Sequence, residues 1–367
     1  MKTPMTSPRS ETRRASRRFA PHGASSAVGS LRQRLLLAWL SGCLVFPSGC
    51  ASHRPADPSA LPSAVPTIPA VWRSPLDRDH PLVGKVWDVA AARFVDPAVV
   101  LDAAARAPLV VTGEQHDNAD AHQLEGSILR AMTRGGRRPA LVAEMLDETE
   151  QSAIERTLAD PTMDVDAFAR AVDWAHSGWP DWSLYRPVFA IAIEGRLPVV
   201  AAGVDRSRTM EIAERGASAV DPTLVRTFAL DRPLDPGVQK ALRDEMRQVH
   251  CGMLPESMLD AMVLVQRLRD AVLASHLVDT THSDGGLLIA GNGHARSDRG
   301  VPAIALRALG RRVLSIGLVE VSHSLAEPFA YAASFSASGL PFDYVWFTPR
   351  ASDVDHCAEV RVRPRKS

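Results

Sequence analysis

Short apolar runs alternate with amphipathic stretches along most of the chain. Six such runs, which have the length and composition of β-strands, lie at residues 109–112, 140–143, 197–201, 286–290, 313–321 and 344–348. The inner four are short and apolar on both faces, which is typical of strands covered by helices on both sides. Alternation of strands with helices predicts βαβ units. The sequence therefore predicts an α/β fold, with a mainly parallel central sheet flanked by helices and the last two runs as antiparallel edge strands.

One long interval contains helical patterns and no convincing strand. These patterns lie at residues 210–215, 223–230, 238–249 and 255–277. We expect an inserted helical lid subdomain, about residues 205–284, over the carboxyl edge of the sheet. The insert contains four methionines, whose flexible side chains suit either the wall of an apolar pocket or the core of the lid; they are Met246, Met253, Met258 and Met262.

The first strand run ends in a polar loop with the sequence LVVTGEQHDN, residues 109–118. The next residues predict a helix whose apolar positions are spaced four apart, at Leu124, Ile128 and Met132. Asn118 is a suitable N-cap for this helix. Glu114 and His116 therefore fall at the carboxyl end of a buried strand, where ligands bind in open α/β sheets. The alternative is a polar turn without chemistry.

Two further strand runs end in polar groups. Glu144 interrupts the apolar run ALVAEML, where a charge is costly unless it is coordinated or paired, for example with a nearby arginine. The segment GNGHARSDRGVP, residues 291–302, follows the fourth run and carries His294. This segment is not a dinucleotide-binding fingerprint, because Arg296 occupies the third glycine position.

The carboxyl ends of parallel strands meet at one sheet edge, so we expect Glu114, His116, Glu144 and His294 to converge there. His116, Glu144 and His294 are then candidate ligands of a divalent metal. All four side chains are alternatively candidate catalytic residues of a hydrolase that uses a metal-activated water or His116 as general base. Neither HExxH nor CxxC spacing is present, so the metal cannot be identified from the sequence.

Aromatic residues are only 5% of the chain, yet they are concentrated in residues 174–189. This cluster would form either a stacking wall for a flat ligand, with Arg186 available for a carboxylate, or a helix packed through its aromatic face. Its members are Trp174, Trp179, Trp182, Tyr185 and Phe189.

The N-terminal segment predicts export. Residues 1–49 contain arginines, a short apolar core and small residues before a cysteine, which is the pattern of a secretory signal. Ser-Gly-Cys occurs twice, so the lipidated cysteine is either Cys50, which follows the longer apolar run, or Cys43. Residues 50–82 include a Pro/Ala/Ser-rich stretch that we interpret as a tether. The folded domain is predicted at 83–350, followed by a tail at 351–367.

Charge and cysteine counts bear on nucleic-acid binding and on the state of the cysteines. The 42 basic and 42 acidic residues give no electrostatic argument for nucleic-acid binding. Lipidation of Cys50 leaves Cys251 and Cys357 for a disulfide in an oxidising compartment. A Cys/His metal site that also uses His250 and His356 is the alternative.

Four motifs in this order resemble the ChaN family of haem-binding lipoproteins, which is related to Tiki-type metalloproteases and erythromycin esterases. They are TGEQHDNADAHQLE, LVAEML, IAGNGHARSDRGVP and DYVWFTPR, and the resemblance covers roughly residues 83–350. The Gly-x-x-His signature falls on Gly113 and His116, and the second-strand glutamate on Glu144.

The resemblance implies a membrane-anchored haem-binding lipoprotein for haem or iron acquisition. Haem would bind near the lid, between the two chains of a homodimer. Neither Leu44 nor Ala51 is an aspartate of the inner-membrane retention type, so we expect a bacterial outer-membrane lipoprotein that faces the periplasm. The alternative is a protease or esterase of the same superfamily. The candidate haem-contacting residues are His116, His122, Tyr185, Arg186, His250 and Arg296.

Overall fold

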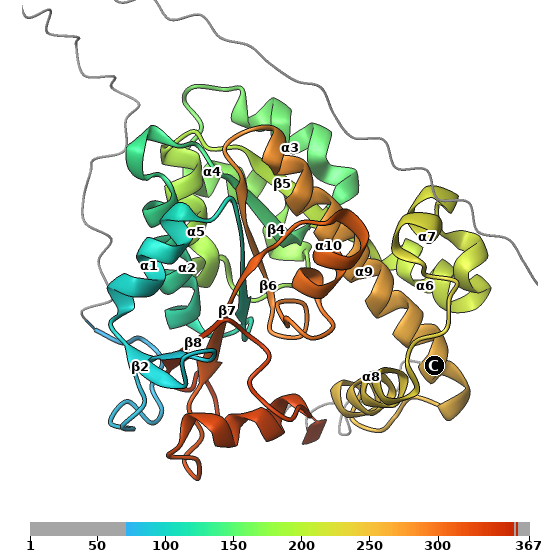
Figure 1. Cartoon of the computed structure of the whole chain (residues 1–367). Coiled ribbons are helices and arrows are strands. Elements are labelled where there is room, and N and C mark those ends of the chain that lie inside the picture. Colours follow the sequence, from blue (N-terminus) through green and yellow to red (C-terminus); the bar gives the residue numbers. More distant parts are fainter. Residues whose placement is uncertain (1–70, 356, 359–367) are drawn as a thin grey trace, which may run out of the picture. The chain divides into compact units, whose positions relative to one another are not determined.

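The computed structural model describes residues 71–355, 357 and 358, and this part of the chain is built on one eight-stranded sheet (Figure 1). The strand order is β2-β1-β8-β7-β3-β6-β4-β5. All neighbours from β8 to β5 are parallel, whereas β1 pairs antiparallel with both β2 and β8. The strands are β1 Val86–Asp88, β2 Arg93–Val95, β3 Leu109–Glu114, β4 Ala140–Asp147, β5 Val199–Gly203, β6 Gly286–Gly291, β7 Leu314–Glu320 and β8 Tyr344–Thr348.

The predicted α/β class and mainly parallel sheet are confirmed, but the prediction of antiparallel edge strands is wrong. The runs at 313–321 and 344–348 are β7 and β8, which are internal strands and run parallel to each other. A 3-10 helix, η7 (Pro328–Phe335), lies in the crossover that makes β8 parallel to β7. The edge is instead closed by β1 and β2, whose three residues each are too few for a period to be recognised.

Helices cover both faces of the sheet. Successive residues of a strand point to opposite faces, so each strand contributes side chains to two cores. Val110 lies in the core shared with α1, α2 and α5, and Val111 in the core shared with α9 and α10 (Figure 1). The described helices are α1 Pro97–Arg106, α2 Ala119–Met132, α3 Gln151–Leu158, α4 Val165–Ala171, α5 Trp182–Glu194, α6 Arg206–Arg215, α7 Pro222–Phe228, α8 Pro236–Val249, α9 Leu259–Asp279 and α10 Val301–Leu309.

Helix α2 begins where the sequence predicts. The Asn118 side chain accepts hydrogen bonds from the backbone N–H groups of Asp120 and Ala121, which caps the helix. Its predicted apolar face is fully buried, at Leu124, Ile128 and Met132. The α2 helix therefore fixes the direction in which the preceding loop presents its polar side chains.

The domain includes residues that the sequence assigned to the tether. The buried carboxylate of Asp120 accepts backbone hydrogen bonds from Arg73 and Ser74, at 2.8 and 2.7 Å. Leu76 forms a β-bridge with Arg350, and Leu82 is buried. The packed segment therefore begins before residue 83. The predicted signal segment, Cys43 and Cys50 lie outside the described residues.

The helical insert is continuous with one layer of the domain. The C-terminal half of α9 packs on the sheet through Leu273 and Leu277. Its N-terminal half forms a small separate core with α8, which contains Met246 and has Met262 packed against it. Met253 and Met258 are on the surface. No helix in residues 71–355 is long and apolar enough to span a bilayer.

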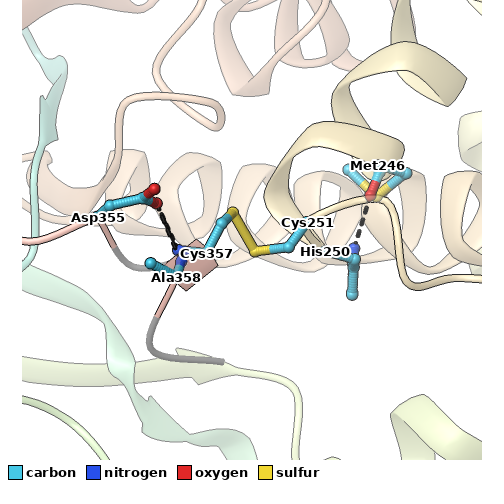
Figure 2. Close-up of a disulfide and its surroundings, with 6 residues drawn as sticks. All are labelled: Met246, His250, Cys251, Asp355, Cys357 and Ala358. Carbon is cyan, nitrogen blue, oxygen red and sulfur yellow. Dashed lines mark hydrogen bonds between the residues drawn. A yellow bond between two sulfur atoms is a disulfide. The ribbon is translucent and has the colours of Figure 1, made fainter. Parts of the chain in front are cut away.

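A disulfide joins Cys251, after α8, to Cys357 near the end of the chain (Figure 2). Asp355 accepts backbone hydrogen bonds from Cys357 and Ala358, and the His250 ring bonds to the Met246 carbonyl. The bridge spans 106 residues, and closing such a loop stabilises a fold by about 4–5 kcal/mol in the chain-entropy model. Because both thiols are oxidised, they are not available to the alternative Cys/His metal site, whose His356 is outside the described residues.

Candidate functional site

The end of β3 carries a carboxylate and an imidazole in direct contact. Glu114 is buried, and its Oε1 lies 2.9 Å from Nδ1 of His116. The hydroxyl of Tyr185, on α5, donates a hydrogen bond to the same oxygen at 2.8 Å. The His116 side chain is 35% exposed, so it is the part of this group that solvent reaches.

The ends of β4 and β6 form a second group. His294 lies between two carboxylates, with Nδ1 2.7 Å from Asp270 and Nε2 3.3 Å from Glu144. The other oxygen of Glu144 accepts the backbone N–H of Gly291 at 2.9 Å. The alternative of an arginine partner for Glu144 is therefore wrong: the partners are an imidazole and a peptide group.

Gly291 lies between the group at the end of β3 and the group formed by β4 and β6. A Cβ atom on this residue would lie 3.1 Å from Nε2 of His116 and 3.9 Å from Oε2 of Glu144. A side chain at position 291 would therefore crowd the His116 ring, so glycine gives the two groups room to approach. The structure thus places Glu114, His116, Glu144 and His294 at one edge, while their catalytic and metal-binding roles remain predictions.

Sequence reasoning missed Asp270. This residue lies on α9, three, four and seven positions before Leu273, Ala274 and Leu277, all of which are buried. A carboxylate on the apolar face of a helix needs a buried partner. That spacing was the available signal, although it does not indicate which imidazole the carboxylate meets.

A third group lies on α2, behind Glu114. Nδ1 of His122 is 2.6 Å from Oε2 of Glu114 and 3.2 Å from Oε2 of Glu125. All three side chains are buried. Glu125 was also missed, although it lies three residues after His122 and hence on the same face of the helix.

The electrostatics of the edge favour charged side chains at neutral pH. Burial opposes ionisation of Glu114, but the imidazoles of His122 and His116 outweigh it and lower its pKa to about 2. For His294, burial opposes the charged form, but Glu144 and Asp270 raise its pKa to about 10. Burial likewise opposes the imidazolium of His116, while Glu114 and Glu144 raise its pKa. The raised pKa extends the pH range in which His116 is protonated, and in that range the ring can donate a proton but cannot act as a general base.

Most of the predicted haem contacts are engaged elsewhere or sealed from solvent. Arg186 forms a two-bond ion pair with Asp166, and the buried Arg296 forms one with Asp298. His122 and Tyr185 are fully buried. The remaining candidates are His250, which lies on the insert, and His116, which lies at the exposed part of the sheet edge.

The aromatic cluster serves mainly as core. Trp174, Tyr185 and Phe189 are buried against one another, in agreement with the packed-helix alternative. Trp179 differs, because it is only partly buried and its ring meets His116 edge-on at 4.9 Å. Beside it is a cavity of about 410 Å³, which is lined by residues that include Arg170, Trp174, Trp179 and Trp182.

A family match and one solved structure agree with this architecture. The family model described as haem-binding uptake, Tiki superfamily, ChaN matches residues 100–304, which is more than half of the chain. A structure of ChaN from Campylobacter jejuni with cofacial haem has a TM-score of 0.54 and 18% identity, over 71% of this chain and 95% of that chain. An open-conformation mutant of the erythromycin esterase EreC has a TM-score of 0.34 and 12% identity, over 61% and 73% of the two chains. No curated protein matches the chain.

Proposed function

The chain belongs to the ChaN family of haem-binding uptake proteins in the Tiki superfamily, and we propose that it is a membrane-anchored lipoprotein that binds haem for iron acquisition. The observation that supports this most directly is His116. Of the ionisable side chains gathered at the sheet edge, it is the one that combines substantial exposure with a fixed ring orientation.

The residues around His116 suit haem as a cargo. A histidine whose Nδ1 is bonded to a carboxylate is held in one orientation, which favours ligation through its other nitrogen. The Trp179 indole beside it offers an aromatic surface. Arg170, on the cavity next to Trp179, offers a cation for a propionate. Ligation requires neutral His116, so haem affinity should rise with pH.

Haem titration of the purified chain tests this proposal. We expect micromolar haem to produce a shifted Soret band, and His116→Ala to weaken binding at least tenfold, because an axial ligand is lost; tenfold corresponds to about 1.4 kcal/mol. His323→Ala is the control, since His323 is 91% exposed. A wild-type chain without a spectral change would remove the haem proposal, and an unaltered titration of His116→Ala would exclude His116 as the ligand.

We further propose that haem is held between two copies of the chain. The Campylobacter jejuni relative is described as binding haem cofacially, an arrangement in which two haems face each other. A partly exposed ligand such as His116 is consistent with a haem that is covered from the other side by a second chain. Light scattering of the titration samples reports whether haem loading pairs two chains.

The anchor is proposed from the N-terminal sequence, which lies outside the described residues. Removal of residues 1–49 would leave Cys50 as an acylated N-terminus on the periplasmic face of the outer membrane. We expect mass spectrometry of the mature protein to find a diacylglyceryl group on Cys50. Cys50→Ser should abolish the lipid, whereas Cys43→Ser should not. Lipid that persists in Cys50→Ser and disappears in Cys43→Ser would assign the anchor to Cys43.

Hydrolysis is the second candidate function. The observation that favours it is the connected series Asp270, His294 and Glu144 next to His116, which resembles a set of acid/base groups. It is placed second because the family match supports haem binding, and because the raised pKa values of both imidazoles work against proton abstraction at neutral pH.

A further inference from the structure

Glu114 has two sides, and only one of them faces the sheet edge. Its Oε1 meets His116 and Tyr185, whereas its Oε2 points inward toward His122 and Glu125. The inner side chains are sealed from solvent. Neither His122 nor Glu125 is needed to explain contact with haem, so the inner group requires an explanation of its own.

In the inner group, which consists of Glu114, His122 and Glu125, one atom of His122 and one of Glu125 form hydrogen bonds to neighbouring residues. Nε2 of His122 bonds to the His116 carbonyl at 3.2 Å, which leaves Nδ1 as the ring nitrogen that can bind a metal ion. The hydroxyl of Thr112 donates to Oε1 of Glu125 at 2.9 Å. These supporting hydrogen bonds are of the kind that orient metal ligands. They leave Nδ1 of His122 and Oε2 of Glu125 facing Oε2 of Glu114, all within 4.8 Å of one another.

The inward oxygen of Glu114 has one close polar neighbour. Oε2 is fully buried and lies 2.6 Å from Nδ1 of His122, an ion-pair contact that lacks the geometry of a hydrogen bond. A buried carboxylate oxygen without a well-formed hydrogen bond is costly. A cation between the three inward atoms would take the place of this contact.

Charge balance is compatible with a divalent ion. With His122 neutral, the carboxylates of Glu114 and Glu125 carry two negative charges, which a divalent cation cancels. In the metal-free protein burial opposes the charged form of His122, but these carboxylates raise its pKa to about 10, and burial raises the pKa of Glu125 to about 7. A metal ion would therefore replace the protons that these two side chains hold.

We propose that Glu114, His122 and Glu125 form a buried site for a divalent metal ion. Zinc bonds of 2.0–2.1 Å in tetrahedral geometry place ligand atoms about 3.3 Å apart. The 3.2 Å separation of His122 and Glu125 matches this value, and the 2.6 Å separation of His122 and Glu114 would open by about 0.7 Å. Nitrogen and carboxylate donors suit zinc or manganese.

This site is distinct from the predicted metal set of His116, Glu144 and His294. A metal ion there would lie behind the sheet edge and hold Glu114, the carboxylate that orients His116. The metal ion would hold the Glu114 carboxylate in place and, through it, the orientation of the exposed His116 ring. The inference does not depend on haem binding.

Elemental analysis of the haem-free chain, after equilibration with ZnCl₂ and removal of free metal, tests the proposal. We expect one zinc per wild-type chain, and a loss of at least tenfold in retained zinc for Glu125→Gln, which removes a charged ligand without changing its size. Glu144→Gln is the matched control at the sheet edge and should retain zinc. Zinc should raise the Tm of the wild type and of Glu144→Gln, but not that of Glu125→Gln.

Thr112→Val provides a second variant in case Glu125→Gln does not fold. It removes only the hydroxyl that supports Glu125, and a loss of this kind weakens metal affinity by about 10–100-fold. Absence of zinc from the wild type would overturn the proposal. Loss of zinc in Glu144→Gln with retention in Glu125→Gln would overturn it as well, and would assign the metal to the sheet edge.

Discussion

Replacing His294 with alanine is expected to lower the free energy of unfolding by about 4–5 kcal/mol at pH 7, because removal of one partner from a buried ion pair leaves an uncompensated charge. Here two carboxylates lose their partner. Asp270 and Glu144 are both buried, and among the described residues His294 is the one that makes an ion pair with each of them. The effect should therefore lie near the upper end of the usual range.

Urea denaturation at two pH values measures this effect and identifies its cause. At pH 4 the carboxylates of the His294→Ala variant can regain protons, so the loss should be smaller than at pH 7. His323→Ala is the control, and it should change stability by less than about 0.5 kcal/mol because its side chain is exposed. A loss that is equal at both pH values would mean that packing, and not charge, dominates at position 294.

The topology of the sheet explains why the residues at its edge could be predicted from the sequence. Glu114, His116, Glu144 and His294 come from three separate segments of the chain. Glu114 ends a parallel strand, His116 and His294 follow one, and Glu144 directly follows Ala143, the last residue that β4 pairs with β6. Parallel strands bring their carboxyl ends to one edge whatever their order in the sheet. The strand order itself could not be predicted, because the periodicity of β7 and β8 does not specify their neighbours.

The residues that were missed lie on helices. Asp270 and Glu125 are acids on buried helix faces. Asp270 meets His294 through the packing of α9 against the sheet, whereas Glu125 meets His122 within α2. The sequence also left Arg186 free for a ligand, whereas Asp166 occupies its guanidinium from another helix. Such pairings depend on side-chain directions, which hydrophobic periodicity does not contain.

Glu114 connects the two proposals. One of its oxygens orients His116, and the other belongs to the buried group with His122 and Glu125. If metal fills the inner site, removing it should loosen His116 without removing a haem ligand. The haem-binding and metal-binding variants are therefore chosen at different residues, so that failure of one proposal leaves the other testable.

The combined contribution of Glu114 and His294 to stability should be greatest between about pH 4.5 and 6.5 and should fall on both sides of this window. On the acid side, the carboxyl of Glu114 has a folded pKa of about 2 against a usual value of 4.5, so its contribution is complete above 4.5 and is lost as the pH falls toward 2. On the alkaline side, His294 has a folded pKa of about 10 against 6.5, so its contribution is complete below 6.5 and is lost as the pH rises toward 10.

The alkaline loss from His294 should be on the order of 4 kcal/mol, since each unit of pKa difference corresponds to about 1.4 kcal/mol. Urea denaturation of the haem-free chain between pH 5 and 10 measures it. In His294→Ala the alkaline decline should become shallower by about this amount. A decline should remain, because burial opposes the charged form of His122 but Glu114 and Glu125 also raise its pKa to about 10. His323→Ala should follow the wild type. A wild-type stability that is constant from pH 6 to 10 would contradict a charged His294, and would mean that Asp270 or Glu144 is already neutral in the folded protein.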